Sequence, residues 1–353
     1  MRFLKRIFLF LVVNIAIIAI LTTVVSVFGI RPYLTPYGLD LTSLAIYSAI
    51  IGFAGSFISL FLSKLMAKWM MKVRVITSSQ DAHEAKLVHI IQNIAQGLNM
   101  KMPEVGIYPS PEVNAFATGW SKNHALVAVS AGLLREMDDT ELEGVLAHEM
   151  AHVANGDMVT MTLVQGILNT FVIFASRVAA YGVSKFLAKN EEIGYLSYYL
   201  IAIVFQIVFG ILASLVVFAF SRYREFRADY GGARFVGKQK MIAALKRLDQ
   251  LSQKIDSRQK SLATMKISDK KSHFGRLFST HPSIDERIER LQRASISGCS
   301  LRILKNNSFP LDSGTRGEKK RASEIAEKLL LVAFWRDGGV SFWNKITMRW
   351  GEK

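Results

Sequence analysis

The sequence predicts a mainly α integral membrane protein, with four transmembrane helices and a cytoplasmic α+β domain. Half of the 353 residues are hydrophobic, and the mean hydropathy of +0.25 is high for a soluble globular protein. The apolar residues are concentrated in four long stretches, and lysine and arginine gather beside them. Basic residues next to apolar segments are typical of membrane helices and indicate which flanks face the cytoplasm.

The four apolar stretches predict membrane helices at about 7–29, 41–63, 158–181 and 193–221. Each is longer than the ~20 residues that a helix needs to cross a ~30 Å hydrocarbon core. One such stretch could be a buried core helix, but four together favour a membrane protein. The first stretch could also be a secretory signal peptide. It is longer than a typical signal core and no small-x-small cleavage site precedes Arg31, so we expect a retained anchor.

The basic residues predict the topology. They lie in three groups beside the apolar stretches: Arg2, Lys5 and Arg6; Lys64, Lys68, Lys72 and Arg74; and Arg222, Arg224 and Arg227. Both termini and residues 64–157 are therefore expected in the cytoplasm. The net charge of +16 is thus explained by topology, and we expect no nucleic acid partner. The only cysteine, Cys299, excludes an intrachain disulfide framework.

The apolar stretches also divide the chain. Residues 1–73 are expected to form an N-terminal membrane hairpin, and residues 158–221 a second one. The cytoplasmic domain is split between residues 74–157 and 222–294, and we assign no role to the tail, 295–353. Within 74–157, "EAKLVHIIQNIAQGLNM" predicts an amphipathic helix, and "PEVGIYPS" and "HALVAVSAGLL" predict strands.

The stretch "GVLAHEMAHVANGD", residues 144–157, is expected on a helix that starts with a capping box at Thr140 and Glu143 and stops at Gly156. Residues four apart share one helical face, so His148 and His152 can both direct a nitrogen to one zinc ion, ~2.0–2.1 Å away. Glu149 is offset from that ion but within reach of a water on it. Zinc acidifies such a water, and Glu149 can accept its proton.

A catalytic zinc ion keeps three protein ligands and one open position. "REFRAD" offers Glu225 as the third ligand, with Asp229 on the same face to fix the tautomer of a ligand histidine. By themselves, the two acidic residues would indicate a solvent-exposed helix face with salt bridges to Arg222 and Arg227. Together with the histidine pair, they favour a site for one zinc ion per subunit. Since both motifs flank the second hairpin, the site is expected at the cytoplasmic membrane surface.

Four motifs, "HEMAH", "EFRAD", "NAFATG" and "THPS", together resemble the HtpX family of membrane zinc metallopeptidases (M48-type), which is related to the CAAX prenyl endopeptidases. The resemblance runs to about residue 294. It implies a zincin-like metallopeptidase domain with His148, His152 and Glu225 as zinc ligands and Glu149 as general base. It also implies proteolytic quality control of misfolded or damaged membrane proteins, at the bacterial cytoplasmic (inner) membrane.

Two further stretches have candidate roles. "NAFATGWSKNHALVAVSAGLL" predicts a hairpin, and its first strand, with Asn114, Ala115 and Phe116, could hold an extended substrate by main-chain hydrogen bonds or be purely structural. His281 could return to the zinc as a transition-state donor or as a resting-state ligand, or it could be an ordinary turn residue.

Two other functions compete with a zinc endopeptidase acting on polypeptides in the lipid bilayer. The first is a zinc-stabilised, non-catalytic membrane scaffold or holdase. The intact Glu149 argues against it, because a structural zinc site normally closes with a fourth protein ligand. The second is a transporter or channel, which the near absence of ionisable residues within the apolar stretches disfavours. The sequence does not indicate an oligomeric state.

Overall fold

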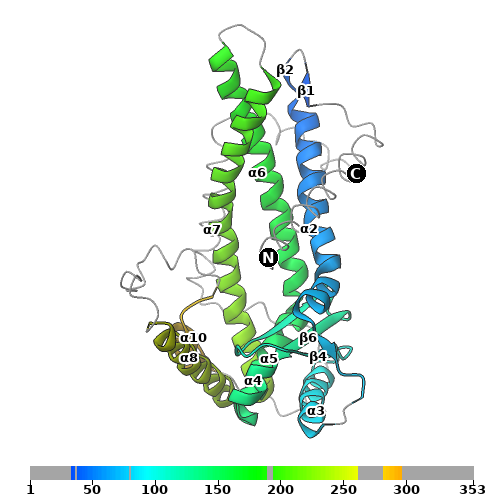
Figure 1. Cartoon of the computed structure of the whole chain (residues 1–353), viewed down its shortest axis with the longest axis vertical. Coiled ribbons are helices and arrows are strands. Elements are labelled where there is room, and N and C mark those ends of the chain that lie inside the picture. The colour runs from blue at the N-terminus through cyan, green and yellow to red at the C-terminus, as the bar shows by residue number, and fades with distance from the viewer. Residues whose placement is uncertain (1–32, 36–37, 79–80, 189–193, 261–280, 296–353) are drawn as a thin grey trace, which may run out of the picture. The chain divides into compact units, whose positions relative to one another are not determined.

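Three long helices dominate the structure, a computed structural model that describes residues 33–35, 38–78, 81–188, 194–260 and 281–295. These are α2 (Leu41–Met71), α6 (Asp157–Ala188) and α7 (Tyr195–Val236), which run side by side (Figure 1). Each is long and apolar enough to cross a membrane. The expected first span, 7–29, and nearly all of the tail lie outside the described residues.

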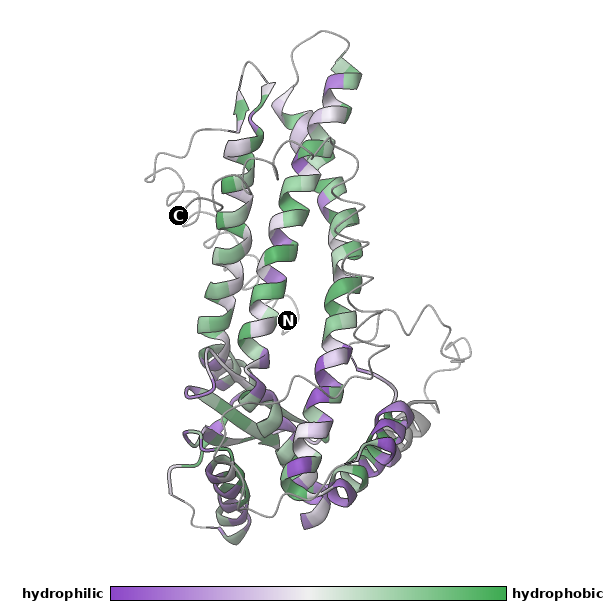
Figure 2. Cartoon of the chain, turned by 180° about the vertical axis from the view of Figure 1, so that it is seen from behind, coloured by the Kyte–Doolittle hydropathy of each residue, from purple (hydrophilic) through white to green (hydrophobic). Residues whose placement is uncertain are grey.

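The three helices pack in chain order, because α6 contacts both α2 and α7. Hydrophobic residues cover most of their length, and hydrophilic residues gather at the end where the other helices and the sheet lie (Figure 2). All three are longer than the apolar stretches that predicted them. A short hairpin of β1 (Leu34–Thr35) and β2 (Gly38–Leu39) precedes α2, whose N-cap Asp40 accepts hydrogen bonds from the backbone of Thr42 and Ser43.

The sheet has four strands in the order β3 (Arg74–Val75), β4 (Glu104–Tyr108), β6 (Ala125–Ser130) and β5 (Ala115–Gly119). β4 and β6 are parallel, whereas β3 and β5 run antiparallel to their neighbours. All six residues of β6 are buried, as expected for a central strand with both faces covered. β5 is an edge strand, paired only with β6 among the described residues.

The predicted hairpin is the pair β5–β6, with Ala115 opposite Val129 and Gly119 opposite Ala125. Gly119 ends β5 with φ at +142°, a conformation that side chains rarely adopt. A Cβ at this position would also lie 2.2 Å from the carbonyl oxygen of His124. The glycine of "NAFATG" is therefore required by the turn of the hairpin.

Replacing Gly119 with alanine should lower the free energy of unfolding by about 1–3 kcal/mol, because strain and a backbone clash act together. The midpoint of thermal unfolding in detergent measures the effect. Gly55→Ala is the matched control, since its Cβ would meet nothing within 4 Å. Equal midpoints for the two variants would contradict this account of the turn.

The core of the sheet domain lies between the sheet and two helices, α3 (Ala82–Gly97) and α5 (Asp139–Asn155). α3 buries Leu87, Ile91 and Ile94 on one face, as the predicted amphipathic helix requires. The short helix α4 (Ala131–Glu136) leads from β6 to α5.

The capping box of α5 was predicted at the wrong residues. It is formed by Asp138 and Glu141, each side chain accepting a hydrogen bond from the other's backbone N–H, rather than by Thr140 and Glu143. An aspartate satisfies the same orphan N–H as a threonine, so both positions fit the motif and only the chain path selects one. The predicted stop is confirmed, since Gly156 caps α5 with φ at 67°.

α7 continues without interruption from its apolar part through residues 222–236, and thus crosses the expected domain boundary at 221/222. Its last turns pack against α5. Gly232 allows this close approach, because a Cβ there would lie 3.1 Å from the backbone nitrogen of His148. α8 (Lys238–Lys260) and α10 (Ile284–Arg293) complete the described fold and pack against each other and against α7.

Candidate metal centre

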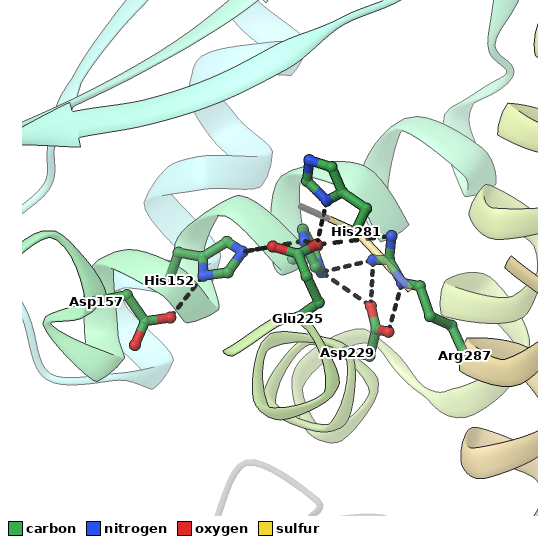
Figure 3. A network of polar contacts seen from close by, with 7 residues as sticks. His152, Asp157, Glu225, Asp229, His281 and Arg287 are labelled. Carbon is green, nitrogen blue, oxygen red and sulfur yellow. Dashed lines mark hydrogen bonds and ion pairs between the residues drawn. The ribbon is translucent and has the colours of Figure 1, made fainter. Parts of the chain in front are cut away.

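Three side chains from α5 and α7 direct donor atoms to one point (Figure 3). The Nε2 atoms of His148 and His152 are 3.2 Å apart. Glu225 Oε2 is 3.4 Å from Nε2 of His148, and Glu225 Oε1 is 3.4 Å from Nε2 of His152. The structure thus brings together the two histidines of "HEMAH" and the glutamate of "EFRAD", 73 residues further on from His152 by their numbers.

These distances fit a metal ion. A tetrahedral ion with bonds of ~2.0–2.1 Å holds its donors about 3.3 Å apart. The two Nε2 atoms are separated by about this distance, and each of them is as far from one of the two Glu225 oxygens. One donor atom from each residue lies within 4.8 Å of the others. Two imidazole nitrogens and one carboxylate oxygen are also the donor types that zinc accepts. The residues therefore fit the group that the motifs predicted.

Glu225 and Asp229 do not form a solvent-exposed helix face, which was the alternative interpretation of "REFRAD". Each is only 2% exposed, and both project from α7 toward α5 (Figure 3). Buried carboxylates require a charged partner or several hydrogen bonds. For Asp229 the partner is Arg287, on α10.

The second nitrogen of each histidine bonds a buried carboxylate. His148 Nδ1 lies 3.0 Å from Asp229 Oδ1, and His152 Nδ1 lies 2.6 Å from Asp157 Oδ2. A carboxylate accepts a hydrogen bond from an N–H group, so we assign the ring proton of each histidine to Nδ1. In this neutral tautomer Nε2 carries a lone pair that can bind a metal. The predicted partner Asp229 is in place for one histidine, and Asp157 serves the other.

Asp157 and Arg287 were not predicted from the sequence. Asp157 is the first residue of α6, and the left-handed turn at Gly156 directs it back to His152. The sequence feature that could have indicated it is an acidic residue directly after Gly156, the glycine at which the zinc-binding helix was predicted to end. Arg287 forms two hydrogen bonds with Asp229, from Nη2 at 2.6 Å and from Nε at 2.7 Å. It lies in a charged helical segment with nothing to distinguish it from its neighbours.

The carboxylates around the histidines control their protonation. Burial by itself lowers the pKa of His148, but hydrogen bonds to Asp229 and Glu225 outweigh it and raise the pKa to about 9. For His152 burial also acts downward, and Asp157 with Glu225 raises the pKa. Without a metal, the site therefore holds a proton where the cation would be.

Glu149 and His281 lie at the edge of this network. Glu149 is half-buried, and its charge contributes to the raised pKa of His152. His281 Nδ1 lies 3.0 Å from Glu225 Oε2, while its side chain remains 64% exposed. His281 thus contacts one of the three donor residues, Glu149 directly follows another on α5, and both side chains are at least partly exposed.

The predicted substrate strand lies beside the same helix, because β5 packs against α5. Ala115 and Phe116 open β5, and Asn114 directly precedes it. The backbone oxygen of Asn114 accepts hydrogen bonds from the backbone of Ser130 and from the Tyr108 hydroxyl. The inner side of this segment is therefore held by the sheet, and its outer edge faces away from β6.

Replacing Asp157 with asparagine should weaken zinc binding by about 10- to 100-fold, because a neutral amide replaces the charged carboxylate beside His152 Nδ1. The amide can present its NH2 group as well as its oxygen, so it no longer fixes the tautomer of His152. Competition with a chromophoric chelator measures the affinity. Asp139→Asn is the matched control on α5, since Asp139 is exposed and forms an ion pair with Lys86 at the surface. An unchanged affinity in Asp157→Asn would remove this residue from the metal site.

The chain was compared with known proteins. Residues 81–295 match the model of Peptidase family M48. A protease HtpX homolog from Bacillus licheniformis is 52% identical over 297 residues, covering 82% of this chain and 99% of that protein. The homolog from Bacillus subtilis is 51% identical over 298 residues, and the protease HtpX of Pseudoalteromonas atlantica is 50% identical over 290, both with the same coverage.

A solved structure has the same fold. Ste24p from S. mikatae superposes with a TM-score of 0.56 at 17% sequence identity, covering 81% of this chain. The chain spans 64% of the length of Ste24p, slightly less than two thirds.

The long apolar helices, the convergent donors and the family match together define a membrane metallopeptidase. The relatives are also named as proteases. The chain belongs to peptidase family M48 and, within it, to the HtpX proteases.

Proposed function

We propose that the protein is a zinc endopeptidase that cleaves misfolded or damaged membrane proteins at the cytoplasmic face of the bacterial inner membrane. The observation that carries the proposal is the convergence of the side chains of His148, His152 and Glu225, whose donor atoms lie within 4.8 Å of one another. Glu149 follows His148 directly on the same helix. The position of this site, where α5 meets membrane-capable helices, supports substrates from the membrane.

The chain's residues have separate tasks in this reaction. His148, His152 and Glu225 would hold the zinc ion, which supplies a Lewis acid for a water and for the substrate carbonyl. Glu149 accepts a proton from the attacking water and later donates it to the leaving amine. His281 donates a hydrogen bond to the oxygen that becomes negative in the transition state. Its contact with Glu225 and its exposed side chain support this role.

β5 holds the substrate in this proposal. An extended peptide can add to an edge strand by main-chain hydrogen bonds, with little demand on its sequence. Asn114, Ala115 and Phe116 lie at the end of β5 near Tyr108, on whose pKa the charge of Glu149 also acts. This is the end of the strand from which a bound peptide would reach the proposed base.

Topology forms the last part of the proposal. Four spans, including 7–29, would place both termini and the metal site in the cytoplasm, with the zincin-like domain divided between 74–157 and 222–294. The basic residues that flank the apolar stretches support this orientation.

Cleavage of casein by detergent-purified protein, with and without a chelator, tests the proposal together with metal analysis. We expect one zinc ion per chain and proteolysis that stops on chelation and returns with zinc. Stoichiometric zinc without proteolysis of casein or of an unfolded membrane protein would instead indicate the zinc-stabilised scaffold.

Zinc binding should release protons near neutral pH. The metal-free His148, whose pKa is raised to about 9, must lose its proton to bind a metal. The apparent zinc affinity should therefore rise between about pH 6 and pH 8, by up to about tenfold per pH unit for each proton displaced. Chelator competition at several pH values measures the slope, after correction for the chelator's own protonation. A flat profile would contradict the protonated metal-free site.

A further inference from the structure

An apolar strip continues on α2 beyond the end of its apolar stretch. Phe61, Leu65 and Trp69 are four residues apart and thus share one helical face, and each is more than half exposed. Lys64 and Lys68, which border the strip on the same turns, bind the carboxylate of Glu104, at 2.8 and 2.5 Å. These ion pairs fix the sheet to α2 along one border of the exposed strip.

The tip of the β5–β6 hairpin, residues 120–124, lies against this strip. The Trp120 ring is 6.3 Å from the ring of Phe61, between centroids, and Lys64 Nζ lies 6.0 Å from the Trp120 centroid. Trp120 also stacks on His124, at 4.9 Å. Trp120 is still 37% exposed, and Lys122 at the tip is exposed as well.

This composition matches the layer where lipid headgroups meet hydrocarbon. Tryptophan prefers that layer because its ring is apolar and its N–H needs a polar partner. Lysine there is attracted to lipid phosphates. Since Trp120 contacts Phe61, which belongs to the apolar stretch 41–63, the tip lies level with the last turns of a membrane-capable helix.

We propose that the tip of the β5–β6 hairpin docks in the headgroup layer of the bilayer, with Trp120 as its anchor. The strip Phe61, Leu65 and Trp69 continues the lipid-facing side of α2, so the tip extends a surface that already faces lipid. Docking holds the sheet, and with it the edge of β5, against the membrane surface. The partner is the lipid bilayer itself.

Depth measurements test the docking without any need for proteolysis. In a Cys299→Ser background, which removes the only cysteine, a spin label is attached at Lys122→Cys or at Gln92→Cys. Gln92 is exposed on α3, which lies at the end of the fold away from the long helices (Figure 1). The protein is placed in nanodiscs of phosphatidylethanolamine and phosphatidylglycerol.

We expect the label at 122 to show a several-fold higher ratio of collisions with oxygen to collisions with a water-soluble nickel chelate than the label at 92. Equal ratios at the two positions would overturn the docking and would leave a protein partner as the explanation for the exposed ring.

A second pair of variants tests Trp120 as the anchor. Trp120→Glu, combined with the label at 122, should lower the oxygen-to-nickel ratio several-fold, whereas Trp120→Phe should preserve most of it. Zinc binding in each variant confirms that the sheet domain is folded. An undiminished ratio in folded Trp120→Glu would overturn the role of this residue.

Discussion

Replacing Glu149 with glutamine should abolish peptide cleavage while leaving the metal bound. Glutamine has nearly the same size as glutamate but cannot accept a proton from water. The metal donors His148, His152 and Glu225 are unchanged, so the ion should still bind. Loss of a general base typically lowers the rate by a factor of about 10² to 10⁴. The rate of casein cleavage should therefore fall by a factor of at least about 10².

Glu143→Gln is the matched control for this experiment. Glu143 lies on the same helix but pairs with Lys240 on α8, away from the donor atoms. Metal content is measured on the same preparations that are assayed for cleavage. Proteolysis at the normal rate by metal-loaded Glu149→Gln would show that another group accepts the proton.

Replacing His148 with alanine should remove both metal and activity. One of three protein donors is lost. The buried carboxylate of Asp229 then keeps Arg287 as its partner, and that of Glu225 keeps His152, His281 and Arg287. Loss of a residue that only supports a metal donor typically lowers metal affinity by up to about 100-fold. We expect the loss of a donor itself to lower zinc affinity by more than this. Zinc per chain after gel filtration measures the loss.

His89→Ala is the control for the histidine substitution itself, since His89 is exposed on α3 and bonds only Asn93 in the described structure. His148→Ala can also destabilise the fold, because an unpaired buried charge is costly. Thermal unfolding of the metal-free wild type and of the variant separates that effect from metal loss. Full zinc occupancy in a folded His148→Ala protein would contradict the donor assignment.

The long helices were predicted in their apolar parts, and their ends were not. α2, α6 and α7 continue to Met71, Ala188 and Val236, well past the last apolar residues that predicted them. Hydropathy records where a segment can meet lipid, whereas a helix continues as long as tertiary contacts cover its next turns. The extension of α7 matters most, because it carries Glu225 and Asp229 on the same rigid element as the apolar span.

The donor set was predictable because each part is local. His148 and His152 occupy one face of one helix by spacing alone, and Glu225 with Asp229 follows the same rule on another. The sequence could not show that these two faces meet. That contact depends on the close approach of α7 to α5 at Gly232, which is a property of packing.

The remaining partners illustrate the same limit. Asp157 follows His152 by five residues, an offset that would place it on a different face of a continuous helix. Only the turn at Gly156 brings the two side chains together. Arg287 reaches Asp229 from 58 residues further along the chain, and no periodicity connects them.

The sequence alone thus determined the apolar segments, the helical spacing of the donors and the type of metal they suit, because these follow from side-chain chemistry and from the repeat of a helix. The tertiary structure decided which carboxylate supports which histidine, which cation balances them and which strand packs against the helix that carries Glu149. Those contacts join residues far apart in the chain, and their formation depends on how the elements pack rather than on any local pattern.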